Sequence, residues 1–145
     1  MADTVKRFSS APMLDLQRFW EVVLFSWMTG NSDMHCKNFS IIDIGDREYI
    51  LAPAYDLLAV WLADPSDTEE MAMAFTVGGE KKGFDRTTFL TAMIQSGIED
   101  RLGERIIRRM CSFRPQWEEL IGMSFLPDTM KDDYLKLIDS RIRLL

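Results

Sequence analysis

Three side chains have the types and spacing of a site for phosphoryl transfer. Asp33 and Asn38 lie five residues apart in "SDMHCKNF", and Asp56 follows the run "YILAPAY". Phosphoryl transfer needs a carboxylate that accepts the proton of the attacking hydroxyl, and oxygen ligands for a Mg2+ that bridges the phosphates. Asp and Asn are hard oxygen ligands of the kind that Mg2+ prefers. The alternative interpretation of residues 30–40 is a connecting turn, because Gly, Asn, Ser and Asp are common in turns.

The elements on either side of this polar loop are expected to hold it rigidly. Residues 13–30, after Pro12, predict a helix that ends at Gly30 and is buried on nearly all sides, since only Asp15, Arg18 and Glu21 interrupt its apolar surface. Two β-rich runs, 39–44 and 49–51, flank Gly45-Asp46 and predict a hairpin. The polar loop then lies before this hairpin and Asp56 lies after it.

The rest of the sequence predicts mostly helices, and therefore one mainly α (α+β) domain over residues 1–145. Residues 57–63 predict a short helix or a buried extended segment, and 71–79 a strand. Helices are expected from Asp85 to Gly97, around 102–110, around 117–121 and over 127–142. The last helix carries two expected exposed ion pairs, Asp132–Lys136 and Asp139–Arg143. The expected inward positions include Ile94 and Leu120, and the four tryptophans are expected in the core.

The composition favours a soluble, cytoplasmic protein. The 145 residues carry a net charge of −6, which disfavours binding of nucleic acid or an anionic membrane by the surface as a whole. No apolar run approaches the ~20 residues that span a bilayer. The two cysteines, Cys36 and Cys111, have no disulfide or metal-ligand spacing and fit a reducing compartment.

The two motifs together resemble those of a known family. "TGNSDMHCKNFSII" followed by "YILAPAYDLL" resembles the HipA-like serine/threonine kinases, the toxin kinases of bacterial toxin–antitoxin pairs, and more distantly the phosphatidylinositol kinases. The resemblance implies the helical C-lobe of a protein-kinase-like fold that acts with ATP and Mg2+. It implies that Asp33 is the catalytic base and that Asn38 and Asp56 are the Mg2+ ligands. His35 and Lys37 match further motif positions, with expected roles in organising the loop and in touching phosphate or substrate.

Two parts of a complete kinase have no counterpart in this sequence. A kinase needs a loop that covers the nucleotide and a lysine that pairs with the phosphates, but only 32 residues precede Asp33. The segment "GGEKKG" at 78–83 is followed by Phe84-Asp85 where a phosphate-binding loop requires Lys-Ser or Lys-Thr, so a turn is expected there. We therefore expect an N-terminal lobe supplied in cis or as a separate chain, and negligible activity without it.

The resemblance also implies a protein substrate and a DNA-binding antitoxin as partners. Two rival interpretations remain: a non-catalytic kinase remnant that binds a partner, and phosphoryl transfer to a lipid, which the acidic charge disfavours. Arg101, Arg105 and Arg108 form a stripe along one predicted helix that also carries Arg109. The stripe is interpreted as a solvated face or as a docking site for an acidic or RNA-bound substrate.

Overall fold

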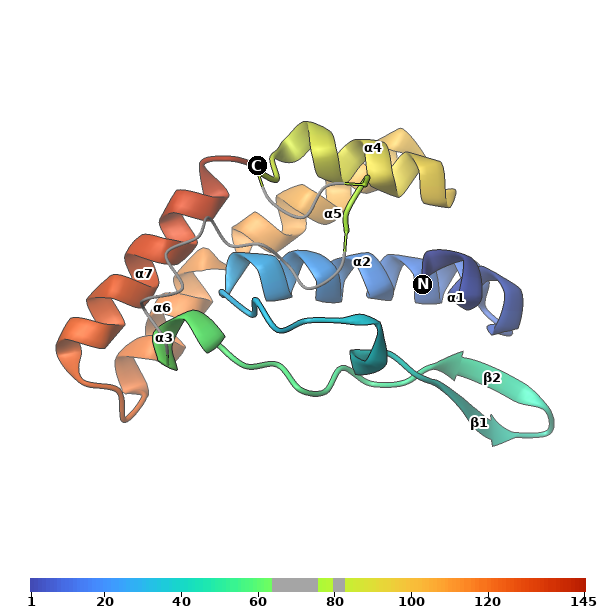
Figure 1. Cartoon of the computed structure of the whole chain (residues 1–145), viewed down its shortest axis with the longest axis horizontal. Helices are drawn as coiled ribbons and strands as arrows, with labels where there is room; N and C mark the ends of the chain where they lie inside the picture. Colours follow the sequence, from blue (N-terminus) through green and yellow to red (C-terminus); the bar gives the residue numbers. More distant parts are fainter. Residues whose placement is uncertain (64–75, 80–82) are drawn as a thin grey trace.

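A computed structural model describes residues 1–63, 76–79 and 83–145, and within these ranges the protein is mainly helical with one β-hairpin (Figure 1). The expected fold class is confirmed. The helices are α1 (Ala2–Phe8), α2 (Pro12–Met28), α3 (Val60–Ala63), α4 (Arg86–Ser96), α5 (Asp100–Ser112), α6 (Arg114–Met123) and α7 (Asp128–Ile142). A single 3₁₀ turn, η1 (Cys36–Asn38), precedes the strands β1 (Ile41–Gly45) and β2 (Glu48–Leu51).

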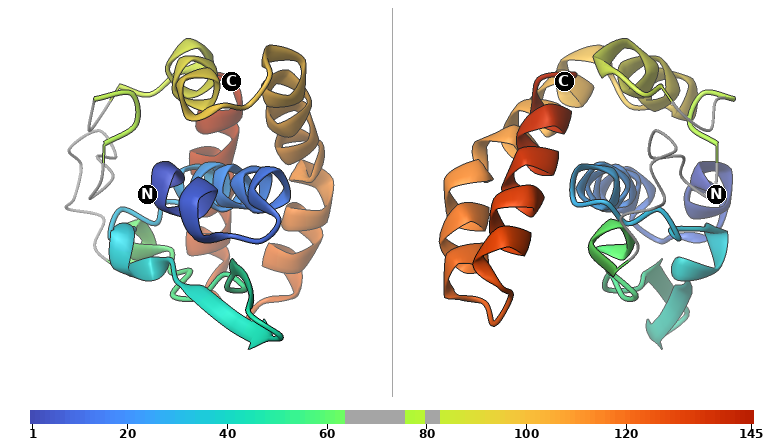
Figure 2. Two further views of the ribbon diagram at one scale, coloured as in Figure 1. Left: turned by 90° about the vertical axis from the view of Figure 1, so that its right-hand side faces the viewer. Right: turned by 60° about the vertical axis from the view of Figure 1, so that its left-hand side comes forward.

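Helix α2 runs through the middle of the protein, with the other helices and the hairpin arranged around it (Figure 2). It begins at Pro12, whose fixed φ and missing N–H suit a first helical position. Leu16, Leu24 and Met28 are fully buried along it. The expectation of a helix buried on nearly all sides is therefore confirmed for most of its length, and α2 provides a fixed base for the loop that follows it.

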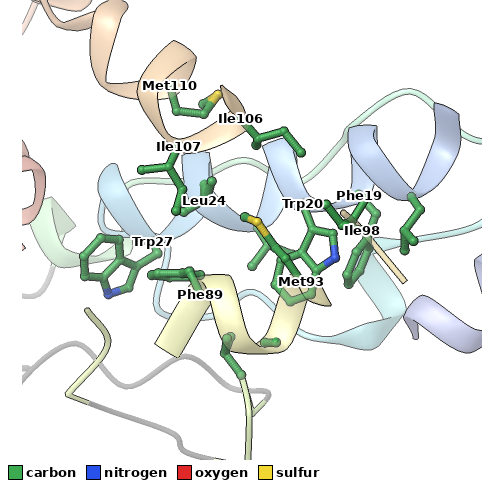
Figure 3. Packing of buried hydrophobic residues seen from close by; sticks show 14 of the residues in the cluster. Phe19, Trp20, Leu24, Trp27, Phe89, Met93, Ile98, Ile106, Ile107 and Met110 are labelled. Atoms are coloured by element: carbon green, nitrogen blue, oxygen red, sulfur yellow. The ribbon is translucent and has the colours of Figure 1, made fainter. Parts of the chain in front are cut away.

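The hydrophobic core lies between α2, α4 and α5 (Figure 3). The Trp27 ring of α2 packs against Phe89 of α4, with ring centroids 5.0 Å apart. Trp20 is also buried, and its indole Nε1–H donates a 2.8 Å hydrogen bond to the hydroxyl of Ser96. Ile106 and Ile107 of α5 cover the other side of this layer. Each such buried side chain contributes about 1.5–3 kcal/mol relative to exposure, so α2 is held firmly from two directions.

The ends of α4 are those that the sequence predicts. The Asp85 carboxylate accepts a 2.8 Å hydrogen bond from the Thr88 backbone N–H, and this bond lowers the pKa of Asp85. Gly97 ends the helix in the left-handed conformation, with φ of 103°. The predicted inward position of Ile94 is wrong, since 48% of it is exposed. Helix α4 faces the core through Phe89 and Met93, and Ile94 lies about 100° further round the helix than Met93, away from that face.

Two further predictions about the C-terminal helices are wrong. Leu120 of α6 is 61% exposed rather than inward. The ion pairs of α7 also differ, because Lys136 pairs with Asp133 at 2.8 Å and Asp139 pairs with Arg114 of α6 at 2.5 Å. Contact between α6 and α7 brings Arg114 to Asp139, a tertiary effect that spacing along one helix does not reveal.

The middle of the sequence is less regular than predicted. Helix α3 covers only Val60–Ala63, and Leu57 and Leu58 before it are exposed. The predicted strand at 71–79 lies outside the described residues up to 75, and Val77 then forms an isolated bridge before a turn at 78–79. The turn expected at 78–83 is described only in part, because 80–82 also lie outside the described residues. Helix α1 was not predicted.

The predicted hairpin is confirmed, with its turn one residue later than the Gly45-Asp46 signal. Strand β1 pairs antiparallel with β2 in a register that places Ile41 opposite Leu51. Asp46 and Arg47 both have positive φ, which is the backbone of a two-residue hairpin turn, and the register shifts next to Gly45. The hairpin extends away from the helices, and its two strands return the chain to the level of the polar loop (Figure 1).

Candidate active site

The polar loop begins at a backbone turn that only glycine fits. Gly30 has φ of +75°, and a Cβ there would lie 2.8 Å from Leu137 Cδ2 and 3.2 Å from Trp61 Cβ. A side chain would therefore meet both strain and overlap. The Gly30 carbonyl also accepts a 3.2 Å hydrogen bond from the Trp61 N–H. The turn fixes the direction in which the loop leaves α2.

Two apolar side chains hold the loop against the core. Met34 is fully buried, and Phe39 is buried with its ring centroid 4.8 Å from that of Phe19 in α2. Asp33, directly before Met34, and Lys37, between the two anchors, stay exposed to solvent. The loop is thus a rigid mount that points its charged side chains outward, as a catalytic loop requires.

The carboxylate of Asp15 fixes the base of the hairpin, where β2 ends. It is fully buried and accepts 2.7 Å hydrogen bonds from the Leu51 N–H at the end of β2 and from the Ser9 hydroxyl. Its other oxygen pairs with Arg18 at 3.2 Å. The sequence placed Asp15 among the polar interruptions of the helix, whereas the structure makes it the link between α2 and β2. This link sets the point from which the chain runs on to Asp56.

The segment from 52 to 61 runs beside the polar loop and is bonded to it repeatedly (Figure 1). Three of these hydrogen bonds involve the loop backbone or a loop side chain: Ala52 N–H to the Ser40 carbonyl (2.8 Å), Tyr55 hydroxyl to the Lys37 carbonyl (2.9 Å), and Asn31 Nδ2–H to the Asp56 carbonyl (3.1 Å). The two motifs are therefore held together by backbone contacts as well as by their own side chains.

The central contact of the site joins Asn38 to Asp56. The Asn38 side-chain Nδ2–H donates a hydrogen bond to Asp56 Oδ2, and Asn38 Oδ1 accepts a 2.9 Å bond from the His35 N–H. Asn38 is only 6% exposed, whereas Asp56 is exposed. Asp56 has φ of 57°, a left-handed backbone that Asp and Asn adopt more readily than most residues. The structure thus brings together two predicted residues that are separated by a whole hairpin.

Among the described residues, His35 bonds to this pair through its backbone N–H, and neither Asp33 nor Lys37 bonds to the Asn38 or Asp56 side chain. The Asp33 carboxylate is exposed and has no hydrogen-bond or ion-pair partner among the described residues. The His35 ring is partly buried, and its Nδ1 has no partner within the part of the chain that the structure describes. Lys37 is exposed and contributes its carbonyl to Tyr55. The His35 backbone N–H orients the Asn38 side chain through its 2.9 Å hydrogen bond.

The pair of Asn38 and Asp56 has the donors that a magnesium ion needs. Both side chains carry hard oxygen atoms and lie within hydrogen-bond distance of each other, but the Asn38 amide presents its Nδ2–H to Asp56 and its Oδ1 to the His35 N–H. Within residues 1–63, 76–79 and 83–145, no three His, Cys, Asp or Glu side chains gather to hold a metal. Mg2+ commonly takes one or two protein ligands and completes its shell with water and substrate phosphates. Asn38 and Asp56 offer this small number of oxygen ligands once the Asn38 amide is turned so that its Oδ1 faces Asp56.

Three residues that position the site were not identified from the sequence as functional. Asn31 and Tyr55 tie the two motifs together, and Asp15 holds the hairpin. Two of them lie beside a recognisable feature: Asn31 follows the helix-ending glycine, and Tyr55 directly precedes Asp56. Their bonds join residues distant in sequence, and no pattern along the chain specifies the partner.

The structure thus contains the arrangement on which the resemblance to HipA-like kinases rests: a polar loop after a buried helix, followed by a hairpin and an Asp. The sequence-family model for the HipA-like C-terminal domain matches residues 1–117, which include all the residues of this site. The chain belongs to this family.

Individual relatives agree with this assignment. A protein of Sinorhizobium fredii named "Putative kinase Y4mE" is 37% identical over 71 residues, 49% of this chain and 16% of its own length. A second, "Putative kinase Y4dM" from the same organism, is 47% identical over 45 residues, 31% of this chain and 11% of its own length. The chain thus spans a small part of these curated relatives.

A solved structure shares the fold over almost the whole chain. It is HipA of Shewanella oneidensis MR-1 in a complex with HipB and its operator DNA, with a TM-score of 0.80 and 20% sequence identity. The match covers 98% of this chain and 34% of that one.

None of the helices in the described ranges is both long and apolar enough to cross a membrane.

Proposed function

We propose that this chain supplies the catalytic residues for ATP-dependent phosphoryl transfer to a serine or threonine hydroxyl of a protein. The observation that carries the proposal is the hydrogen bond between Asn38 and Asp56, which unites two motif positions across the hairpin. The family assignment over residues 1–117 supports a kinase-related role for the same region.

Each residue has a role that its environment allows. The exposed Asp33 carboxylate accepts the proton of the attacking hydroxyl, because none of the described protein groups is bonded to it. Asn38 and Asp56 hold Mg2+, which when bound neutralises charge on the transferred phosphate. His35 orients Asn38 through its backbone N–H, and the exposed Lys37 ammonium attracts phosphate or substrate. Positioning and electrostatics of this kind carry most of the catalysis in phosphoryl transfer.

The proposed partners follow from the relatives. A lobe that covers the nucleotide, in cis or as a separate chain, would complete the cleft, and a protein would be the phosphate acceptor. A DNA-binding antitoxin is a further proposed partner, because the similar HipA was solved with HipB and operator DNA.

The proposal is tested by adding the N-terminal lobe of a relative to this chain, with radiolabelled ATP, Mg2+ and candidate acceptor proteins. We expect negligible transfer by the chain alone and measurable transfer by the mixture. Asp33→Asn should reduce that transfer by about 100-fold or more, the usual size of a general-base contribution. Asp128→Asn is the control, since the Asp128 side chain is 98% exposed on α7 and outside the site. Transfer by the mixture that survives Asp33→Asn would refute the assigned base.

A further inference from the structure

Helix α5 presents three arginines on one exposed face, here named the arginine stripe: Arg101, Arg105 and Arg108. Packing fixes this orientation. Gly103, on the opposite face, is buried, and a Cβ there would lie 3.2 Å from Leu90 Cδ2 of α4. Ile106 is buried on the same inner face. Helix α5 therefore cannot turn to bury or redirect the stripe.

The arginine stripe has no ion-pair partner among the residues that the structure describes. The carboxylate best placed along the helix is Glu104, which lies four residues before Arg108. Glu104 instead pairs with Arg86 of α4. The neighbouring Arg109 is also engaged, with Glu21 of α2 at 3.3 Å. Paired residues thus flank the stripe on both sides while the stripe itself stays unpaired.

The arrangement is unfavourable for the isolated helix. Like charges three and four residues apart on a helix repel by about 0.2–0.5 kcal/mol per pair. Arg101 also lies in the first turn of α5, where a cation opposes the helix dipole. No ion pair within residues 1–63, 76–79 and 83–145 offsets these terms. Three unpaired arginines are also unexpected on a chain with a net charge of −6.

We propose that the arginine stripe docks an acidic helical segment of a partner protein. An α-helix rises about 1.5 Å per residue, so the backbone positions of the three arginines are spaced about 6 and about 4.5 Å along α5. A partner helix with carboxylates at positions i, i+4 and i+7 repeats this spacing. Arginine forms bidentate pairs with carboxylates and is enriched in protein interfaces. The surface is distinct from the candidate active site, because none of the site residues lies on α5.

The charge of the whole chain favours a protein partner over a nucleic acid. Nucleic-acid binding depends on neutralising many phosphates, and domains that do so are generally strongly basic. The sequence pI here is about 4.8, so the net negative charge of the rest of the chain repels a long polyanion that extends past the stripe. A short acidic helix needs only local complementarity.

The test compares two charge-matched variants of this chain. One is Arg101→Gln/Arg105→Gln/Arg108→Gln, and the control is Arg7→Gln/Arg47→Gln/Arg143→Gln, which removes three exposed arginines from other elements. The probe is a fluorescent 21-residue helical peptide with glutamates at i, i+4 and i+7, measured by anisotropy at low salt. We expect the stripe variant to bind about tenfold more weakly than the wild type and the control to be unchanged. The stripe variant should unfold at the same temperature or higher, because repulsion is relieved.

Three results would overturn the proposal. If the wild type does not bind the peptide, the stripe has no affinity for acidic helices. If both variants lose equal affinity, binding reflects net charge rather than the stripe. If a 21-base-pair duplex binds more tightly than the peptide, and only the stripe variant loses it, the surface recognises nucleic acid instead.

Discussion

Replacement of the buried Asp15 carboxylate should destabilise the whole protein. In Asp15→Ala, the Leu51 N–H and the Ser9 hydroxyl lose their acceptor, and Arg18 loses its ion-pair partner. The Leu51 N–H is buried in the core side of the hairpin, so water cannot readily replace the carboxylate. The change therefore breaks the connection between α2 and β2 on which the position of Asp56 depends.

The size of the effect follows from these contacts. Hydrogen bonds to a charged group are worth about 1.5–3 kcal/mol each, and a buried donor left without a partner costs about 1–3 kcal/mol. The contacts share one carboxylate and are not additive, and the Arg18 pair is half exposed and adds little. We therefore expect Asp15→Ala to lower the free energy of unfolding by about 3 kcal/mol, and Asp15→Asn, which keeps one acceptor oxygen, by about 1–2 kcal/mol.

Urea unfolding followed by circular dichroism measures these differences. Asp128→Ala serves as the surface control, because its pair with Lys131 is 3.6 Å long and almost fully exposed on the Asp128 side. It should lose no more than about 0.5 kcal/mol. A loss below about 1 kcal/mol for Asp15→Ala would refute the argument that this carboxylate anchors the hairpin.

Three further predictions concern single residues. Asp56→Asn should change the free energy of unfolding by less than about 0.5 kcal/mol, because Asn keeps an acceptor for Asn38 and tolerates positive φ. Asp56→Ala should lose about 1–2 kcal/mol in thermal melts, and equal losses for the two variants would contradict this prediction. Folding lowers the pKa of Asp85, so the charged cap stabilises α4 fully at pH values above those at which carboxyl groups ordinarily titrate. This contribution to stability is lost as the pH falls through the lowered pKa. The stability difference between wild type and Asp85→Ala should therefore be about 1 kcal/mol at neutral pH and should shrink in acid; a difference independent of pH would exclude the charged cap. Burial raises the pKa of the Cys111 thiol, whereas Cys36 is exposed. A thiol reagent at pH 8 should therefore react with Cys36 in a fast phase, and Cys36→Ser should remove that phase. A fast phase that persists in this variant would show that Cys111 is the reactive thiol.

Local signals in the sequence were sufficient for most of the helices and for the motif residues. Asp85 and Gly97 mark the ends of α4 because each acts within its own turn. The spacing of Asp33 and Asn38 and the position of Asp56 after a hairpin predict a shared site; Asn38 and Asp56 do meet in the structure, and the roles of all three residues stay predictions.

The features that could not be predicted depend on contacts between elements. Asp15 has the spacing of an exposed polar residue, but in the structure it is fully buried and accepts a hydrogen bond from the Leu51 N–H. Asp139 has Arg143 in reach along its helix but pairs with Arg114 on another. Asn31 reaches Asp56 only after the chain has formed the hairpin and returned. In each case the partner lies beyond the range over which helix and strand periodicity carry information.

The most direct test of the account is where a divalent cation binds. Mn2+ can replace Mg2+ at oxygen ligands and broadens the NMR signals of nearby nuclei, so a ¹⁵N-labelled chain can be titrated with Mn2+ in the presence of ATP. The account predicts that the backbone amides of Asn38 and Asp56 broaden first and that Asp56→Asn removes this selectivity. Broadening that begins instead at the acidic surface of α7, around Asp132 and Asp133, and is unaffected by Asp56→Asn would contradict the assignment of Asn38 and Asp56 as the metal ligands of a kinase site.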